Sequence, residues 1–198
     1  MRAHFVEMSK NSMNMESVRL AVLATLLLAA SCARSPSGPY AVLETSKGRL
    51  VARLYSDRAP LTVAHLRALA DEKKLYDGTV FHRVIPGLLI QGGDPAGTGE
   101  GDPGLPVPDE PWAGARFDKP GLLGMASWGP GTSQTQFFVT LAAAPDLDGK
   151  HTIFGELVEG LDVAKAIAAV PRDEKSGNDR PFDPPVLKSL RVVAALPR

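Results

Sequence analysis

Residues Phe81–Asp94 read FHRVIPGLLIQGGD, and this stretch says most about the fold. It contains the end of one strand-like run, Thr79–Ile85, and the whole of a second, Leu88–Gln91. Six further runs have the same character: Tyr40–Thr45, Arg49–Tyr55, Leu122–Ala126, Gln136–Leu141, Thr152–Val158 and Val186–Ala194. The sequence therefore predicts eight β-strands.

Two segments between these runs have the spacing of helices. Leu61–Leu75 carries helix-forming residues, and Pro60 stands at the first helical position, where its missing N–H is not needed. Leu161–Val170 is the second predicted helix, and a proline ends it. Gly/Pro-rich loops are expected at Asp94–Pro120 and Arg172–Pro185. Mostly antiparallel strands with two helices predict a mostly-β fold, either a barrel or a sandwich, capped by the helices.

The composition excludes several classes of protein. Of the 198 residues, 17 are Pro and 19 are Gly, which is too many for a helical bundle. The 22 basic and 22 acidic side chains give no net charge and form no long basic run, so a nucleic-acid partner is not expected. The single cysteine cannot form an internal disulfide bond. A chain of this length suits one domain, which we place at residues 40–195.

The N-terminal region has the layout of a secretory signal peptide. Arg19 precedes Leu20–Ala30, an uncharged and mostly apolar run of eleven residues, and small residues follow it. A helix needs about 20 residues to cross a bilayer, so this run is too short for an ordinary membrane anchor. We therefore interpret residues 1–31 as a cleaved signal peptide and exclude them from the fold.

The end of that region, Leu28-Ala29-Ala30-Ser31-Cys32, resembles the lipobox of bacterial lipoproteins, although Leu is usual where this chain has Ala29. The resemblance implies a lipid on Cys32, residues 32–39 as a tether, and attachment to a membrane of the bacterial cell envelope. By resemblance to the sorting rules of Gram-negative lipoproteins, Ala33 in place of Asp favours the outer membrane, with the protein facing the periplasm. The alternative, a buried helix with a buried thiol, fits poorly with the Ser, Pro and Gly residues that follow.

Three blocks stand out in the rest of the chain: Phe81–Asp94, Gly124–Phe138 (GMASWGPGTSQTQFF) and Leu147–Gly155 (LDGKHTIFG). Together they resemble the cyclophilins, a family of peptidyl-prolyl cis/trans isomerases, and the resemblance extends from about Tyr40 to Ala194. It implies an eight-stranded antiparallel β-barrel capped by two α-helices. It also implies a monomeric enzyme that acts on proline-containing polypeptides without a cofactor or a metal ion.

The resemblance also assigns the site residues. Arg83 falls at the family's catalytic arginine, and Gln91 at the glutamine that helps to position this arginine and the substrate. Phe138 falls at the floor of the pocket for proline. The other residues expected to bind the substrate are Leu88, Leu89, Met125, Ala126, Ser127, Trp128, Gln136, Leu147 and His151.

These residue types suit the chemistry of prolyl rotation. Twisting the bond breaks amide resonance, and the barrier is about 20 kcal/mol. As resonance is lost, the imide nitrogen regains a lone pair, so a fixed donor such as Arg83 interacts more strongly with the twisted state than with the planar states. An apolar pocket around the proline ring disfavours the charge-separated planar amide.

Trp128 is the most unusual residue of the expected groove. Cyclophilins commonly have Ala at this position, whereas the neighbouring changes, Ser127 for Asn and Leu88 for Phe, are milder. We expect the indole to border the groove and to restrict the residue two places before the proline to small side chains. In the alternative interpretation, the ring packs across the loop Gly129–Gln134.

Other functions have less support. The residues around Ser127 are one too many for the Gly-x-Ser-x-Gly of a hydrolase. Gly97–Gly101 lacks the Lys-Ser/Thr ending of a phosphate-binding loop, and the spacing of the histidines does not indicate a metal site. Two alternatives remain on the same fold. One is a lipid-tethered module or chaperone that binds proline peptides with little turnover, and the other is a structural lipoprotein, which needs no intact pocket. Arg83, Gln91 and Phe138 favour the enzyme.

Overall fold

The structure of the chain is a computed structural model, and it describes residues 38–101 and 103–196. The expected signal peptide, Cys32 and residues 33–37 of the expected tether lie outside the described residues. Within the described part of the chain, no helix is long and apolar enough to span a membrane. All the described residues belong to the unit that begins at Gly38.

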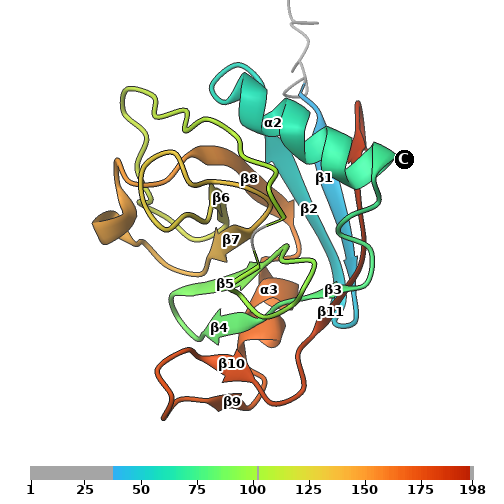
Figure 1. Cartoon of the computed structure of the whole chain (residues 1–198), viewed down its shortest axis with the longest axis vertical. Coiled ribbons are helices and arrows are strands. Elements are labelled where there is room, and N and C mark those ends of the chain that lie inside the picture. Colours follow the sequence, from blue (N-terminus) through green and yellow to red (C-terminus); the bar gives the residue numbers. More distant parts are fainter. Residues whose placement is uncertain (1–37, 102, 197–198) are drawn as a thin grey trace, which may run out of the picture. The chain divides into compact units, whose positions relative to one another are not determined.

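Nine strands form the main sheet, and all neighbours in it are antiparallel. The strands are β1 (Tyr40–Thr45), β2 (Gly48–Leu54), β3 (Thr79–Val80), β4 (Arg83–Ile85), β5 (Leu89–Gly92), β6 (Leu122–Met125), β7 (Phe137–Thr140), β8 (Ile153–Glu159) and β11 (Val186–Val193). Their order is β3-β11-β1-β2-β8-β6-β7-β5-β4. Figure 1 shows β1, β2 and β11 side by side as long strands, with the shorter β4 and β5 on the other side of the domain.

The two edge strands of this sheet, β3 and β4, follow each other in the chain. Only Phe81 and His82 separate them, and both side chains are buried. Because β3 pairs with β11 and β4 pairs with β5, the sheet has to curl so that its two edge strands come close together without pairing. The predicted single strand Thr79–Ile85 is therefore two short strands, and the sheet has nine strands where the sequence predicted eight.

Two α-helices accompany the sheet, one toward the upper end and one lower in Figure 1, and a short 3-10 helix, η2, spans Pro145–Leu147. α2 (Pro60–Arg67) starts with a proline as predicted, and a short π-helical segment, η1 (Ala68–Glu72), continues it. α3 (Leu161–Ala168) follows Gly160, which has a φ of +88°. A Cβ atom on Gly160 would lie 2.4 Å from the carbonyl oxygen of Arg49, so only glycine fits there. The mostly-β antiparallel fold with two helices is thus confirmed, in the form of a half-barrel.

The segment predicted as the loop Arg172–Pro185 contains a second, two-stranded sheet. β9 (Arg172–Asp173) and β10 (Arg180–Pro181) pair in antiparallel orientation and form a ribbon. The ribbon is attached to β4, because the Val84 N–H donates to the Asp179 carbonyl oxygen at 3.0 Å. The prediction of an irregular loop is wrong for β9 and β10, since strands of two residues are too short to show an alternating pattern.

Candidate active site

One row of residues crosses four strands on the outer face of the curled sheet. Arg83 on β4 is paired with Gln91 on β5, Gln91 with Phe138 on β7, and Phe138 with Gly124 on β6. Residues paired across antiparallel strands point to the same face. The register thus brings together the three residues that the sequence assigned to catalysis. The next row points the other way, into the main core, and consists of Val84, Ile90, Val139 and Leu123.

Phe138 is held in place by two rings and by a glycine. Its ring centroid lies 5.4 Å from that of Phe117 and 5.4 Å from that of His151. The ring also lies directly over Gly124, where a Cβ atom would come within 2.3 Å of the Phe138 ring. Glycine at position 124 is therefore a requirement of the site, because any side chain would push the ring away.

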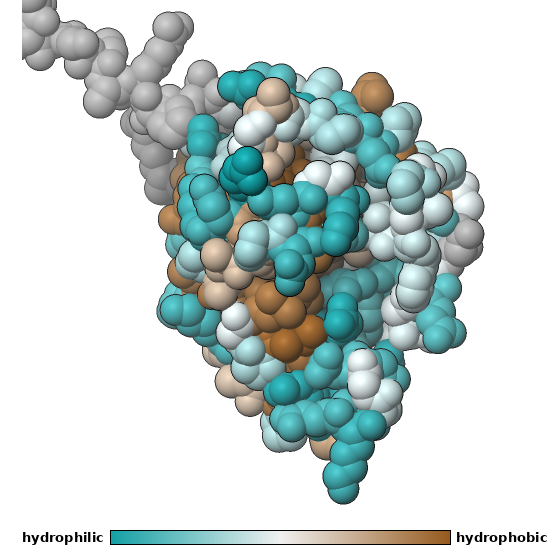
Figure 2. Space-filling view, turned by 90° about the vertical axis from the view of Figure 1, so that its left-hand side faces the viewer, coloured by the Kyte–Doolittle hydropathy of each residue, from teal (hydrophilic) through white to brown (hydrophobic). Residues whose placement is uncertain are grey.

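Apolar side chains surround Phe138 on the outer face. Leu89 belongs to the same buried cluster, and partly buried residues pack against this cluster, among them Leu88, Ala126 and Leu147. Figure 2 looks onto the side of the domain that is on the left in Figure 1, and it shows apolar residues gathered in the middle with hydrophilic residues around them. The expected pocket residues thus lie together around the ring of Phe138.

His151 is oriented by a backbone oxygen. Its Nδ1 lies 3.0 Å from the Met125 carbonyl oxygen, which can only accept, so Nδ1 carries the proton. Ser127 Oγ lies 3.4 Å from the same Nδ1. In the neutral ring, the other nitrogen, Nε2, is then a hydrogen-bond acceptor. The Met125 side chain is 2% exposed and belongs to the main core. The side chain of Met125 therefore lies in the main core, while its carbonyl oxygen reaches His151.

A chain of amide hydrogen bonds links Gln91 of the row to Gln136 and to the loop at Gly99. Gln91 Nε2 donates to Gln136 Oε1 at 3.0 Å, and Gln136 Nε2 donates to the carbonyl oxygen of Gly99 at 3.1 Å. Gln136 is buried, whereas Gln91 is partly exposed. Gln136 thus fixes the amide of Gln91 next to Arg83.

The loop that accepts this hydrogen bond is organised around the buried Asp94. The carboxylate accepts the N–H groups of Ala96 at 2.9 Å, Thr98 at 2.8 Å and Gly99 at 2.7 Å. Burial alone would raise the pKa of Asp94, but these donors outweigh it and hold the pKa below its ordinary value. The N–H groups of this Gly-rich loop therefore bind a carboxylate of the chain itself.

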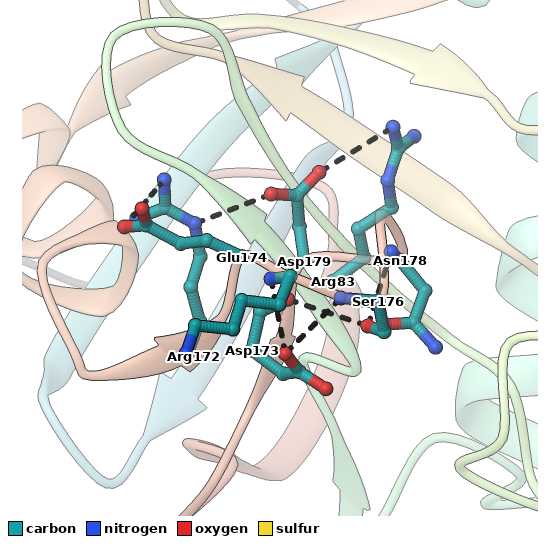
Figure 3. A network of polar contacts seen from close by, with 8 residues as sticks. Arg83, Arg172, Asp173, Glu174, Ser176, Asn178 and Asp179 are labelled. Carbon is teal, nitrogen blue, oxygen red and sulfur yellow. Dashed lines mark hydrogen bonds and ion pairs between the residues drawn. The ribbon is translucent and has the colours of Figure 1, made fainter.

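Arg83 projects from this row with its side chain 40% exposed. Its Nη2 lies 3.9 Å from Oδ2 of Asp179, which belongs to the turn of the β9–β10 ribbon (Figure 3). An exposed guanidinium beside an apolar pocket can donate to a bound peptide, because arginine carries five N–H donors and stays charged.

Trp128 lines a hollow together with His151. Its side chain is 79% exposed, so the loop Gly129–Gln134 does not cover it. It lines a cavity of about 500 Å³ together with Ser127, His151, Lys150 and other residues. The indole is therefore available at a hollow that shares His151 with the pocket around Phe138.

The sequence motifs did not assign a role to four residues of this arrangement: Gly124, Phe117, Asp94 and Asp179. Gly124 and Asp94 stand inside the quoted blocks, so their presence was visible although their contacts were not. Phe117 and Asp179 stand in segments expected to be loops, where no pattern indicated them. Among the described residues, no group of three or more His, Cys, Asp or Glu side chains is arranged to hold a metal ion.

Comparison with known proteins agrees with this geometry. Residues 40–192 match the family described as cyclophilin type peptidyl-prolyl cis-trans isomerase/CLD. The chain is 43% identical over 166 residues to peptidyl-prolyl cis-trans isomerase A of Mycobacterium tuberculosis, covering 77% of this chain and 91% of the relative. It is 45% identical over 155 residues to peptidyl-prolyl cis-trans isomerase ppi1 of Schizosaccharomyces pombe, covering 77% and 96%.

A solved structure gives the same result. The cyclophilin type peptidyl-prolyl cis-trans isomerase of Cryptosporidium parvum, solved in the presence of the dipeptide Ala-Pro, superposes with a TM-score of 0.71. The two are 32% identical, and the match covers 77% of this chain and 98% of the other. The matched region contains the whole row from Arg83 to Gly124. The chain therefore belongs to the cyclophilin-type peptidyl-prolyl cis-trans isomerase family, which confirms the fold and the enzyme class predicted from its motifs.

Proposed function

We propose that the domain catalyses rotation about X-Pro bonds of exported proteins and so assists their folding, with Arg83 stabilising the twisted imide. The observation that carries this proposal is the row in which Arg83, Gln91 and Phe138 lie side by side on the outer face. The reaction makes and breaks no covalent bond, so the chain needs no group beyond its own side chains. The relatives named as isomerases support the reaction, and the Ala-Pro dipeptide of the Cryptosporidium structure supports a proline-containing substrate.

The pocket and the arginine act on different parts of the barrier. The apolar surface of Phe138, Leu89 and Leu147 receives the proline ring and removes water from the imide. Less polar surroundings disfavour the planar, charge-separated amide relative to the twisted one. Arg83 then donates to the lone pair that appears on the imide nitrogen, an interaction that neither planar isomer offers.

Gln91 and the residues behind it keep this arrangement rigid. The hydrogen bond from Gln91 to Gln136, and that from Gln136 to Gly99, leave the amide of Gln91 with a fixed orientation beside Arg83. A fixed amide can orient the peptide on one side of the rotating bond while the proline ring is held on the other. Rotation about the bond between them then requires no further ordering of the substrate.

The decisive experiment compares Arg83→Ala with the wild type in a proline-isomerisation assay. We expect kcat/KM to fall about a hundredfold to a thousandfold, which corresponds to about 3 to 4 kcal/mol, as for other single preorganised donors. Arg49→Ala is the matched control, because Arg49 is an exposed arginine on β2 that pairs with Glu44. Its rate should equal that of the wild type. An Arg83→Ala enzyme with an unchanged rate would refute the role of Arg83.

The same assay tests the alternative of a binding module. If the wild type binds a proline peptide but does not accelerate its isomerisation, the domain is a tethered binding module or chaperone. Binding can be followed separately by titration, so a loss of affinity and a loss of turnover are distinguishable. We favour the enzyme because a module that only holds proline needs the pocket around Phe138 but gains little from Arg83.

We further propose that the protein is a monomer held in the bacterial cell envelope by a lipid on Cys32, on the outer membrane and facing the periplasm. The support is the apolar run of eleven residues that precedes the only cysteine. Radiolabelled palmitate should enter the wild type and not Cys32→Ser, and only the variant should appear in the soluble fraction. Equal labelling of the two proteins would refute the anchor and leave the isomerase proposal unaffected.

A further inference from the structure

We propose that Asp179 is a positioning residue for Arg83, and that its carboxylate orients the guanidinium toward the rotating imide bond. The inference rests on the isomerase function proposed above. Asp179 lies in the turn between β9 and β10, outside the sequence blocks that identify the other site residues.

The carboxylate of Asp179 lies between two guanidinium groups (Figure 3). Oδ2 is 3.9 Å from Nη2 of Arg83, and Oδ1 is 3.3 Å from Nε of Arg172. The side chains of Asp179 and Arg172 are only 20% and 19% exposed. Such a pair is screened by salt less than a fully exposed one, and its geometry is better defined.

The backbone of Asp179 is fixed to the same strand that carries Arg83. The N–H of Val84, the residue after Arg83, donates to the Asp179 carbonyl oxygen at 3.0 Å. Asp179 has a φ of +52°, in the left-handed region that glycine adopts most easily and that Asp and Asn tolerate. A glycine would fit this backbone with less strain but would leave Arg83 without a carboxylate.

The ribbon is anchored on its other side as well. Arg180 Nη1 donates to the carbonyl oxygen of Gly97 at 2.7 Å, in the loop that Asp94 organises. Arg172, which holds the Asp179 carboxylate, is also 3.2 Å from Glu174. The ribbon therefore contacts both Arg83, through Asp179, and the loop that accepts the hydrogen bond of Gln136, through Arg180.

This arrangement limits the freedom of a long side chain. An arginine without a partner samples many rotamers, and that freedom has to be lost each time it meets the substrate. The 3.9 Å contact between Nη2 of Arg83 and Asp179 is an ion pair and not a hydrogen bond, so the N–H donors of the guanidinium stay available for a peptide. Asp179 thus orders Arg83 before the substrate arrives. Because Arg83 donates to the twisted state, this ordering should raise kcat more than it lowers KM.

The test is a double-mutant cycle with Asp179→Asn and Arg83→Ala, measured as kcat and KM for an Ala-Pro peptide. Asparagine keeps the shape and tolerates the same backbone conformation, but it removes the charge. We expect Asp179→Asn to lower kcat about threefold to tenfold, the range of a partly exposed ion pair, with little change in KM. In the Arg83→Ala background the same substitution should have no further effect.

Glu174→Gln is the matched control, because Glu174 belongs to the same network but contacts Arg172 and not Arg83. Its kcat should equal that of the wild type. The proposal is overturned if Asp179→Asn lowers kcat equally with and without Arg83, since the carboxylate then acts on the fold. It is also overturned if kcat is unchanged. A rise in kcat overturns it as well, because the carboxylate would then oppose the action of Arg83 on the imide.

A second measurement separates this proposal from the isomerase function itself. The Nε–Hε signal of Arg83 in ¹⁵N NMR spectra should shift and become more mobile in Asp179→Asn and remain unchanged in Glu174→Gln. A wild type without isomerase activity would refute the proposed function, while the NMR comparison would still decide whether Asp179 orders Arg83. Conversely, an Arg83 signal that is unaffected by Asp179→Asn overturns the positioning role in a fully active enzyme.

Discussion

Phe137 and Phe138 are neighbours on β7, and their side chains are 1% and 3% exposed. Phe137 points into the main core, where its ring centroid lies 5.8 Å from that of Tyr76. Phe138 points to the outer face, where it packs against Phe117 and His151 and lies over Gly124. Burial alone therefore does not distinguish a residue that holds the fold from one that forms the pocket.

The strand alternation distinguishes them. The rows on the inner face join residues of the main core, whereas the outer row joins Arg83, Gln91 and Phe138. Substitutions on the inner face should therefore change the free energy of unfolding, and substitutions on the outer face should mainly change the rate. This comparison can be tested with pairs of variants on the same or neighbouring strands.

The pair Phe137→Ala and Phe138→Ala should show the largest difference. Phe137→Ala leaves a cavity in the main core and should lower the free energy of unfolding by about 3 to 5 kcal/mol. Phe138→Ala opens onto the pocket and should lower it by about 1.5 to 3 kcal/mol, the value of burying one such side chain. Urea denaturation measures both values.

The rates should follow the opposite order. Loss of the Phe138 ring should lower kcat/KM about tenfold to a hundredfold, because the proline ring loses its apolar contact. Phe137→Ala should keep most of its activity under conditions where it remains folded. The comparison fails if the two variants lose stability and activity to the same extent.

Gly124→Ala should displace the Phe138 ring on the outer face by adding a single methyl group. The new Cβ atom would overlap the ring of Phe138, so the ring has to move, at a cost of about 1 to 3 kcal/mol. We expect kcat/KM to fall about tenfold, because the pocket floor is displaced. The isomerisation assay with an Ala-Pro peptide measures this effect.

Gly92→Ala is the control for this variant, because Gly92 pairs with Phe137 in a row of the inner face. Its Cβ atom would lie 3.2 Å from the Phe81 ring and 3.2 Å from the carbonyl oxygen of Val80, so the ring and the β3 backbone both have to shift slightly. Stability should fall by about 1 kcal/mol with a rate near that of the wild type. A Gly92→Ala variant that is less active than Gly124→Ala would contradict the assignment of the two faces.

The motifs that resemble the cyclophilins assigned roles to single residues of the outer row, but they did not predict the row itself. Arg83, Gln91 and Phe138 each have neighbours that indicate a role, and the structure brings them together as one row. The motifs did not indicate which way the side chain of Met125 points, and the structure places it on the inner face, where Met125 pairs with Phe137. That result follows from the strand register, which a single sequence does not reveal.

The rest of the site depends on contacts between distant segments. Asp179 reaches Arg83 through a ribbon whose strands are too short to leave a sequence pattern. The closeness of Gly124 to Phe138 depends on which strands are neighbours. The split of the predicted strand Thr79–Ile85 has the same origin, because its two ends pair with opposite edges of the sheet. Local patterns therefore predicted the elements, but not the pairings that complete the site.

The smallest expected effect concerns the boundary of the outer face at Trp128. The chain has two tryptophans, and Trp112 is partly buried, with Nε1 donating to the Ile153 carbonyl oxygen at 3.1 Å. Trp128 is exposed beside Ser127 and His151, so a peptide in the groove should contact its ring. A proline peptide should therefore change the tryptophan emission of the wild type and of Trp112→Phe, but not that of Trp128→Phe.

The same indole should set a preference for small residues two places before the proline. Trp128→Ala removes the ring that crowds a bulky residue, and because this exposed ring can turn aside, the relief should be only about twofold to tenfold in rate, which corresponds to about 0.5 to 1.5 kcal/mol. Peptides with a bulky residue at that place should gain this factor relative to peptides with Gly, while the rate for Gly stays constant. Because Trp128 is mostly exposed and lies outside the row, Trp128→Ala should leave the free energy of unfolding unchanged. An emission change that survives in Trp128→Phe, together with an unaltered preference in Trp128→Ala, would place Trp128 outside the peptide groove and end the functional face at His151.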